Sequence, residues 1–137
     1  MRDDAPLLLD TSAWTRYLRR GSPELTATIK GALAAGRVAT CPVVNAELLQ
    51  GCLDDRSFEA LQNVLAGLVE IPVTGTVWRG TAHLSYMLRR RGLTIGLPDL
   101  LIAQCAITTS RVLWHLDAHF EQIREYAPLQ TRMWDLS

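Results

Sequence analysis

The chain has 137 residues, of which 48% are hydrophobic and 20% are charged, so it can bury the core of one domain, residues 1–137, and does not resemble a disordered polypeptide. Lys plus Arg and Asp plus Glu both number 14, a balance that excludes a generally basic surface but not a local acidic cleft with a basic rim. No apolar run approaches the ~20 residues of a membrane span, and Cys41, Cys52 and Cys105 lack paired spacing, which favours reduced thiols. We therefore expect a cytoplasmic protein with no membrane partner.

Predicted strands and helices alternate along the chain. Apolar runs predict strands at residues 5–9, 37–40, 69–73 and 111–116, and an edge strand at 128–130. Helical spacing and capping residues predict helices from the cap Thr11 or Ser12 to Gly21, from Ser22 to near Gly36, from Pro42 to Leu49, from Asp54 or Asp55 to Leu68, from Thr74 or Gly75 to Arg91, and from Asp99 to Thr108. A short helical turn follows the fourth strand. The alternation predicts an α/β fold with a central, mainly parallel sheet of four to five strands, covered on both faces.

Four carboxylates are predicted to meet at one edge of this sheet. Asp10 ends the first strand, Asp117 ends the fourth, and Asp99 lies in the first turn of a helix that is apolar around nearly its whole circumference and therefore buried. The carboxyl ends of parallel strands and the helix N-termini that follow them share one edge, so topology alone gathers these three acids. Glu47 lies a turn and a half into the helix after the second strand, and its longer side chain has to reach them.

Clustered carboxylates repel one another, and a hard divalent cation relieves that repulsion. Oxygen ligands favour Mg²⁺ or Mn²⁺. Zinc fits less well because His83, His115 and His119 have no cysteine partner at finger spacing. We assign His115 and His119 to structural or rim positions and also consider His119 as a substrate contact. The predicted chemistry is metal-dependent hydrolysis of a phosphodiester.

Cations near the acidic cluster would be needed to bind a polyanionic substrate. Arg16, Arg19 and Arg20 follow the first acid closely and are the candidate contacts. A guanidinium group matches the geometry of a phosphate group through two parallel hydrogen bonds. The sequence therefore predicts a basic rim beside the acidic site.

Four segments of the chain, taken together and in this order, resemble the PIN domain. They are LLLDTSA at 7–13, CPVVNAELLQG at 41–51, GLPDLLIA at 96–103 and LDAHF at 116–120. The length of the chain is similar to that of the VapC toxins of bacterial toxin–antitoxin pairs. The resemblance implies a PIN-like three-layer α/β/α sandwich and an endoribonuclease that inhibits translation or growth.

The resemblance also implies roles for residues and for partners. The four acids match the acidic quartet of the family, which holds one or two Mg²⁺ or Mn²⁺ ions, and Thr11 and Ser12 match the auxiliary polar positions beside the first acid. RNA is the implied substrate, a cognate VapB-like antitoxin the implied partner, and homodimers and toxin–antitoxin hetero-oligomers the implied assemblies. Many relatives carry a further Asp where this chain has His119, which leaves the number of metal ions open.

Three alternatives stay open at this point. A catalytically weak PIN protein would act as an interaction module through the apolar residues of its early helices, Leu18, Leu25 and Ile29. A PIN nuclease could act on DNA, because no residue signals recognition of a 2′-hydroxyl. A phosphatase of the haloacid dehalogenase type would use Asp10, but Ser12 stands where that chemistry needs a second Asp.

Overall fold

The computed structural model describes residues 4–134, so the extreme ends of the predicted domain 1–137 lie outside the described residues. Strands and helices alternate through the described part. The elements are β1 (Leu7–Leu9), α1 (Thr11–Leu18), α2 (Pro23–Ala34), β2 (Val38–Thr40), α3 (Pro42–Gln50), α4 (Asp55–Ala66), β3 (Val69–Glu70), α5 (Gly75–Arg90), α6 (Leu97–Thr109), β4 (Val112–His115), α7 (Ala118–Arg124) and β5 (Gln130–Met133).

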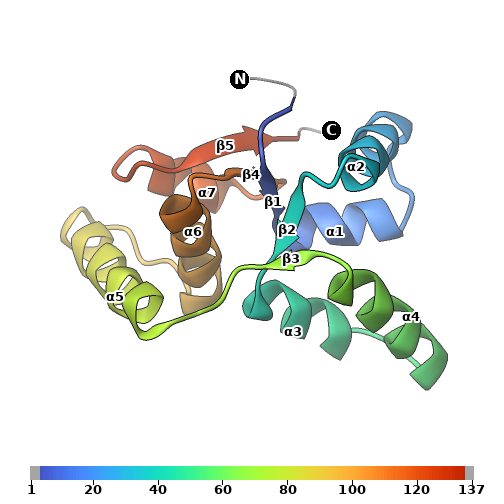
Figure 1. The fold of residues 1–137 in the computed structure, drawn as a ribbon. Coiled ribbons are helices and arrows are strands. Elements are labelled where there is room, and N and C mark those ends of the chain that lie inside the picture. Colours follow the sequence, from blue (N-terminus) through green and yellow to red (C-terminus); the bar gives the residue numbers. More distant parts are fainter. Residues whose placement is uncertain (1–3, 135–137) are drawn as a thin grey trace.

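The five strands form one sheet in the order β3-β2-β1-β4-β5, and every pair is parallel. In the register of the central strand, Leu7 lies beside Val38 on one side and Val112 on the other. Helices α1 to α4 lie on one side of the strands and α5, α6 and α7 on the other (Figure 1). The predicted α/β sandwich with a parallel sheet is therefore confirmed.

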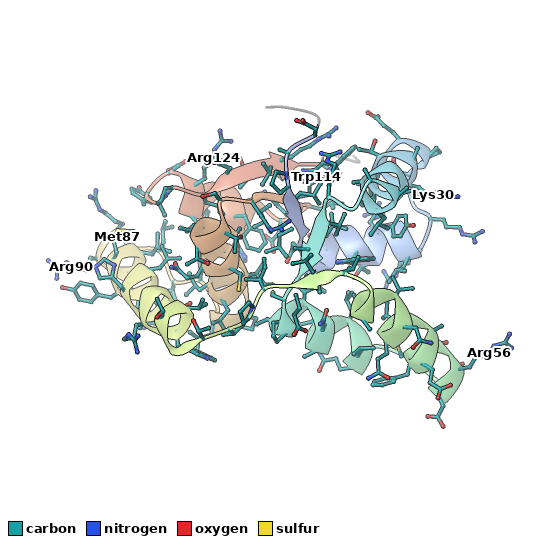
Figure 2. The ribbon with its side chains drawn as sticks, in the orientation of Figure 1. Lys30, Arg56, Met87, Arg90, Trp114 and Arg124 are labelled. Carbon is teal, nitrogen blue, oxygen red and sulfur yellow. The ribbon has the colours of Figure 1, made fainter. Side chains whose placement is uncertain are left out.

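The core forms where the apolar runs of the sequence predict it. All three residues of β1 are fully buried, as expected for a central strand that is covered on both faces. The helix α6 buries six residues around its circumference, and α5 buries the single stripe Val77, Thr81, Leu84 and Leu88. Side chains fill the space between the sheet and both helical layers, whereas the labelled cations Lys30, Arg56 and Arg90 point outward (Figure 2).

Several element ends differ from the prediction because tertiary structure sets them. Asp10, not Thr11 or Ser12, is the N-cap of α1, since its side chain accepts the backbone N–H of Ser12. That helix ends at Leu18 rather than Gly21, and Arg20 takes a left-handed φ of 54°. Strand β3 has only two residues, and Pro72, which cannot donate to a ladder, follows it.

The prediction that Leu18, Leu25 and Ile29 form an exposed apolar surface on the early helices is wrong for two of the three residues. Leu25 and Ile29 are fully buried, because α2 turns the side that carries them into the hydrophobic core. Leu18 is the exception and is 48% exposed. Within residues 4–134, none of the helices combines the length and apolar character that crossing a lipid bilayer requires.

Candidate active site

The four predicted acids line one cleft of about 480 Å³. Asp10 directly follows β1, and Asp117 lies two residues beyond the neighbouring strand β4, where it is the N-cap of α7 rather than the end of the strand. Asp99 lies in the first turn of α6, as predicted, although that helix already begins at Leu97. Glu47 reaches the same cleft from α3. The structure thus brings all four carboxylates to one place at the carboxyl edge of the sheet.

Asp10 is the most deeply placed of the four acids and is only 4% exposed. Burial raises the pKa of its carboxyl, and hydrogen bonds from the Ser12 hydroxyl, the Ser12 backbone and the Thr11 backbone act in the opposite direction. The N–H of Ser12 lies 3.0 Å from Asp10 Oδ2, and the Ser12 hydroxyl donates to the same oxygen. A buried carboxylate fixed in this way is a preorganised ligand for a cation.

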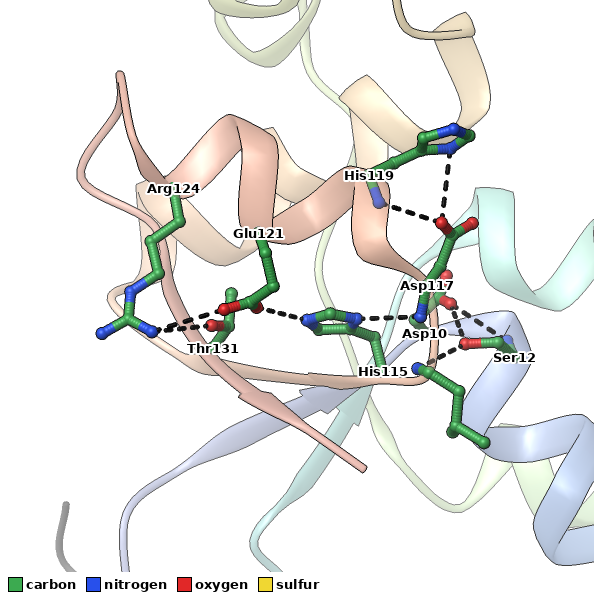
Figure 3. A network of polar contacts seen from close by, with 9 residues as sticks. Asp10, Ser12, His115, Asp117, His119, Glu121, Arg124 and Thr131 are labelled. Atoms are coloured by element: carbon green, nitrogen blue, oxygen red, sulfur yellow. Dashed lines mark hydrogen bonds and ion pairs between the residues drawn. The ribbon is translucent and has the colours of Figure 1, made fainter. Parts of the chain in front are cut away.

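Ser12 also joins the ends of the two central strands. Its Oγ donates to Asp10 and accepts the backbone N–H of Leu116 at 3.0 Å (Figure 3). Leu116 directly precedes Asp117. One hydroxyl therefore sets the position of the acid after β1 relative to the segment that carries the acid after β4.

Thr11 holds the side chain of Glu47 toward the acidic cleft. The hydroxyl of Thr11 donates to Glu47 Oε1 at 2.7 Å, across 36 residues of sequence. Helices α1 and α3 contact each other on the same side of the sheet, which allows this bond to form. The two hydroxyls that follow Asp10 thus orient two different acids of the cluster.

Asp99 and Asp117 form the more open half of the site, together with His119. Burial raises the pKa of Asp99, and the negative charges of Asp10 and Asp117 add to that rise. His119 Nδ1 lies 3.6 Å from Asp99 Oδ2 and 3.4 Å from Asp117 Oδ1. One ligand atom from each of these three residues lies within 4.8 Å of the others. His119 therefore lies at the acidic cluster itself.

A buried histidine behind Asp117 supports the site, a role more specific than the structural or rim position that the sequence predicts for it. His115 is fully buried, and its Nδ1 accepts the backbone N–H of Asp117 at 3.0 Å. The proton of a neutral ring must then be on Nε2, which lies 2.8 Å from Glu121 Oε2 (Figure 3). Burial raises the pKa of Glu121, but hydrogen bonds from Thr131 and His115, together with nearby positive charge that includes Arg124, hold that pKa below its usual value. No spacing rule links these side chains, because contacts between β4, α7 and β5 create the network.

The predicted basic rim is divided by the structure. Arg16 in the last turn of α1 and Arg19, the C-cap of that helix, line the acidic cleft. Arg20 lies beyond the end of that helix and lines a separate depression with Tyr17, Leu18, Thr26 and Lys30. Gly21 lies against the Arg16 side chain so closely that a Cβ there would overlap Arg16 Cδ. Two of the three predicted arginines therefore share the site with the acids.

The donor set fits a hard divalent cation. Asp10, Glu47, Asp99 and Asp117 offer carboxylate oxygens, the ligands that Mg²⁺ and Mn²⁺ prefer. The raised pKa values of Asp10 and Asp99 reflect burial and, for Asp99, mutual repulsion, both of which a cation would offset. His119 adds one nitrogen donor to two of these acids.

Comparison with known proteins places this arrangement in a family. The family model for the PIN domain matches residues 7–126. Ribonuclease VapC11 of Mycobacterium tuberculosis is 33% identical over 128 residues, which cover 90% of this chain and 96% of the relative. Ribonuclease VapC18 of the same organism is 30% identical over 122 residues, which cover 84% of this chain and 85% of the relative.

Solved structures share the fold at lower identity. The crystal structure of VapBC2 from Rickettsia felis, bound to a DNA fragment from its promoter, contains a chain that superposes with a TM-score of 0.77 at 22% identity and covers 94% of this chain and 98% of its own. VapC20 of Mycobacterium tuberculosis, described as a sarcin–ricin loop cleaving toxin, superposes with a TM-score of 0.64 at 17% identity, covering 85% and 93%. The match of the family model and the VapC relatives agree with the parallel sheet and its acidic edge, and the chain belongs to the PIN-domain family, among the VapC ribonucleases.

Proposed function

We propose that this chain is a metal-dependent endoribonuclease toxin, which hydrolyses RNA phosphodiester bonds and thereby inhibits translation or growth. The observation that carries the proposal is the convergence of four acids from β1, α3, α6 and the end of β4 on one cleft that Arg16 and Arg19 also line. The named activity of the VapC relatives, at 30% identity or more, supports an RNA substrate. We also propose that residues 1–137 act as one PIN domain.

In this proposal Asp10, Glu47, Asp99 and Asp117 hold Mg²⁺ or Mn²⁺. A bound cation would supply a nucleophilic water at neutral pH and neutralise charge on the phosphate. Ser12 and Thr11 act as positioning residues, because their hydroxyls bond to Asp10 and Glu47. Fixed ligands lower the cost of reorganisation when the substrate arrives.

Arg16 and Arg19 are the proposed substrate-binding residues. They lie in the same cleft as the acids, where their guanidinium groups can bind phosphates on either side of the scissile bond. Arg20 loses this role because it faces a different depression. His119 lies beside Asp99 and Asp117 rather than among the arginines, so a contact with RNA is only a secondary role for it.

A VapB-like antitoxin is the proposed partner, with a homodimer and a toxin–antitoxin hetero-oligomer as the proposed assemblies. The support is the shared fold with chains that were solved as VapBC complexes, two of them bound to DNA, from Rickettsia felis and Salmonella typhimurium. Light scattering of the purified chain, alone and with the antitoxin, would test both assemblies. A chain that is monomeric on its own would refute the homodimer, and an unchanged mass after the antitoxin is added would refute the proposed partner.

Cleavage of RNA by the purified chain, free of antitoxin, tests the proposed activity. Total bacterial RNA and single-stranded DNA would be incubated with the protein and Mg²⁺ or Mn²⁺, beside an EDTA control. Asp99→Asn removes one ligand charge, and Glu59→Gln, an exposed acid on α4, is the matched control. We expect discrete RNA fragments that require metal, disappear with Asp99→Asn and persist with Glu59→Gln. Cleavage of DNA alone would refute the RNA substrate, and no cleavage by folded protein would favour an interaction module.

A further inference from the structure

His119 occupies an unusual place for a rim residue. Its backbone N–H donates to Asp117 Oδ1 at 3.0 Å, which fixes the residue beside the cap of α7. Its ring turns back toward the same carboxylate (Figure 3). The ring nitrogen Nδ1 then lies near two acids at once, Asp99 and Asp117.

The distances differ from those of a strong hydrogen bond. An N–H···O bond has its heavy atoms about 2.9 Å apart, whereas Nδ1 lies 3.4 Å and 3.6 Å from the two carboxylate oxygens. Two ligand atoms that share one ion at about 2.1 Å, with angles between about 90° and 109°, lie about 3.0–3.4 Å apart. The distance to Asp117 lies at the upper end of this range, and the distance to Asp99 lies about 0.2 Å beyond it. Both are longer than a hydrogen bond, so Nδ1 is placed between the two acids, where a shared ion would bind, rather than on either of them.

We propose that His119 Nδ1 is a ligand of the same ion as Asp99 and Asp117, and that this nitrogen shifts the preference of the site from Mg²⁺ toward transition-metal ions. The inference rests on the proposed function for the presence of a cation at the acidic cluster. Imidazole is a poor ligand for Mg²⁺, which favours oxygen and its own waters. Affinity for nitrogen-containing sites rises from Mn²⁺ through Co²⁺.

The net charge of the site also favours transition-metal ions over Mg²⁺. An aspartate at this position would add a fifth negative charge to Asp10, Glu47, Asp99 and Asp117, which favours hard cations that bind mainly by charge. A neutral imidazole contributes a donor atom without that charge. The affinity of the site with His119 consequently depends on which ion binds and not only on the charge of that ion. A site of five acids would discriminate less among divalent ions.

Metal binding, measured without RNA, tests this inference. The dissociation constants of Mg²⁺, Mn²⁺ and Co²⁺ would be determined by calorimetry for the wild-type chain, His119→Asp and His119→Ala. His83→Ala, an exposed histidine on α5, is the matched control. We expect the preference for Co²⁺ over Mg²⁺ to fall by about tenfold or more in both His119 variants, the order of loss that even indirect metal partners produce, and to stay unchanged in His83→Ala.

The absorption spectrum of bound Co²⁺ gives a second readout, because its visible bands respond to replacement of a nitrogen ligand. The spectrum should change with His119→Asp and not with His83→Ala. Equal metal preferences and identical spectra in all variants would overturn the inference, as would an effect of His119→Ala on the KM for RNA alone. If the metal preference shifts but the wild-type chain cleaves no RNA, the ligand role of His119 stands and the proposed ribonuclease function fails. If the wild-type chain cleaves RNA but the His119 variants keep its metal preference, the ribonuclease function stands and the ligand role fails.

Discussion

Asp99→Asn should stabilise the metal-free protein although it removes a proposed metal ligand. Ligand atoms of Asp99 and Asp117 lie within 4.8 Å of each other. Two unit charges at that separation repel by about 0.9 kcal/mol in water and about 3.5 kcal/mol at an effective dielectric constant of about 20. The two side chains are 29% and 39% exposed, and solvent and salt screen them. We therefore expect a gain of about 1 kcal/mol in the free energy of unfolding.

The pH dependence of this gain follows from the direction of the pKa shift. The pKa of Asp99 is raised above the ordinary value of 3.8, chiefly by burial and then by the charge of Asp10. A raised carboxyl pKa favours the folded state at a pH below 3.8, and that contribution is lost as the pH rises through the folded-state pKa. The advantage of Asp99→Asn should accordingly be small near pH 3.8 and reach its full size at neutral pH.

Urea unfolding in EDTA, followed at several pH values, would measure the difference. Glu59→Gln, which removes an exposed acid on α4, should leave the stability unchanged. Mg²⁺ should reverse the order, since an ion at one hundred times its dissociation constant stabilises the wild type by about 2.7 kcal/mol and the variant by less. An Asp99→Asn protein that is less stable than wild type in EDTA at neutral pH would refute the idea that the acids repel one another.

Two further substitutions test the parts that position the site. Ser12→Ala should lower the free energy of unfolding by about 1–3 kcal/mol, because it removes the acceptor of the Leu116 N–H; urea unfolding in EDTA measures it, and an unchanged midpoint would contradict the joining role of Ser12. Gly21→Ala should raise the KM for RNA, since the new Cβ displaces the Arg16 side chain, whereas Gly67→Ala, whose Cβ would make an ordinary contact 3.5 Å away, should leave KM unchanged. Equal KM values for the two variants would contradict a role of Arg16 in binding RNA.

The parts of the fold that sequence predicts well are those fixed by burial. The apolar run of β1 needs cover on both faces, which only a central strand receives, and the apolar residues around most of the circumference of α6 require a helix that is buried against the sheet and its neighbours. The places of both elements therefore follow from the sequence pattern. Leu25 and Ile29 lie one helical turn apart, a spacing that is typical both of a core stripe and of an apolar docking surface. The structure shows that they form a core stripe together with Ala32. The spacing alone does not say whether the stripe is covered by this chain or by a partner.

In the acidic site too, some residues can be placed from the sequence and others only from the structure. Asp10, Asp99 and Asp117 could be placed from topology because each lies near a strand end or a helix start on one edge of a parallel sheet. The separation of Arg20 from Arg19 depends on where α1 ends and on a left-handed backbone at one residue. The hydrogen bonds of His115 depend on the packing of three elements, so they are visible only in the folded structure.

In the described part of the chain, the acids and the arginines of the cleft do not form ion pairs with each other. Within residues 4–134, the ion pairs of the four acids are those that Asp99 and Asp117 make with His119, and no arginine lies within ion-pair distance of the quartet. Arg16 and Arg19 nevertheless line the same cleft, and pairing them with the acids would have relieved the repulsion that the raised pKa of Asp99 records. Keeping the two charges apart leaves the acids free for a cation and the arginines free for phosphate, which are the two ligands that hydrolysis of RNA brings together.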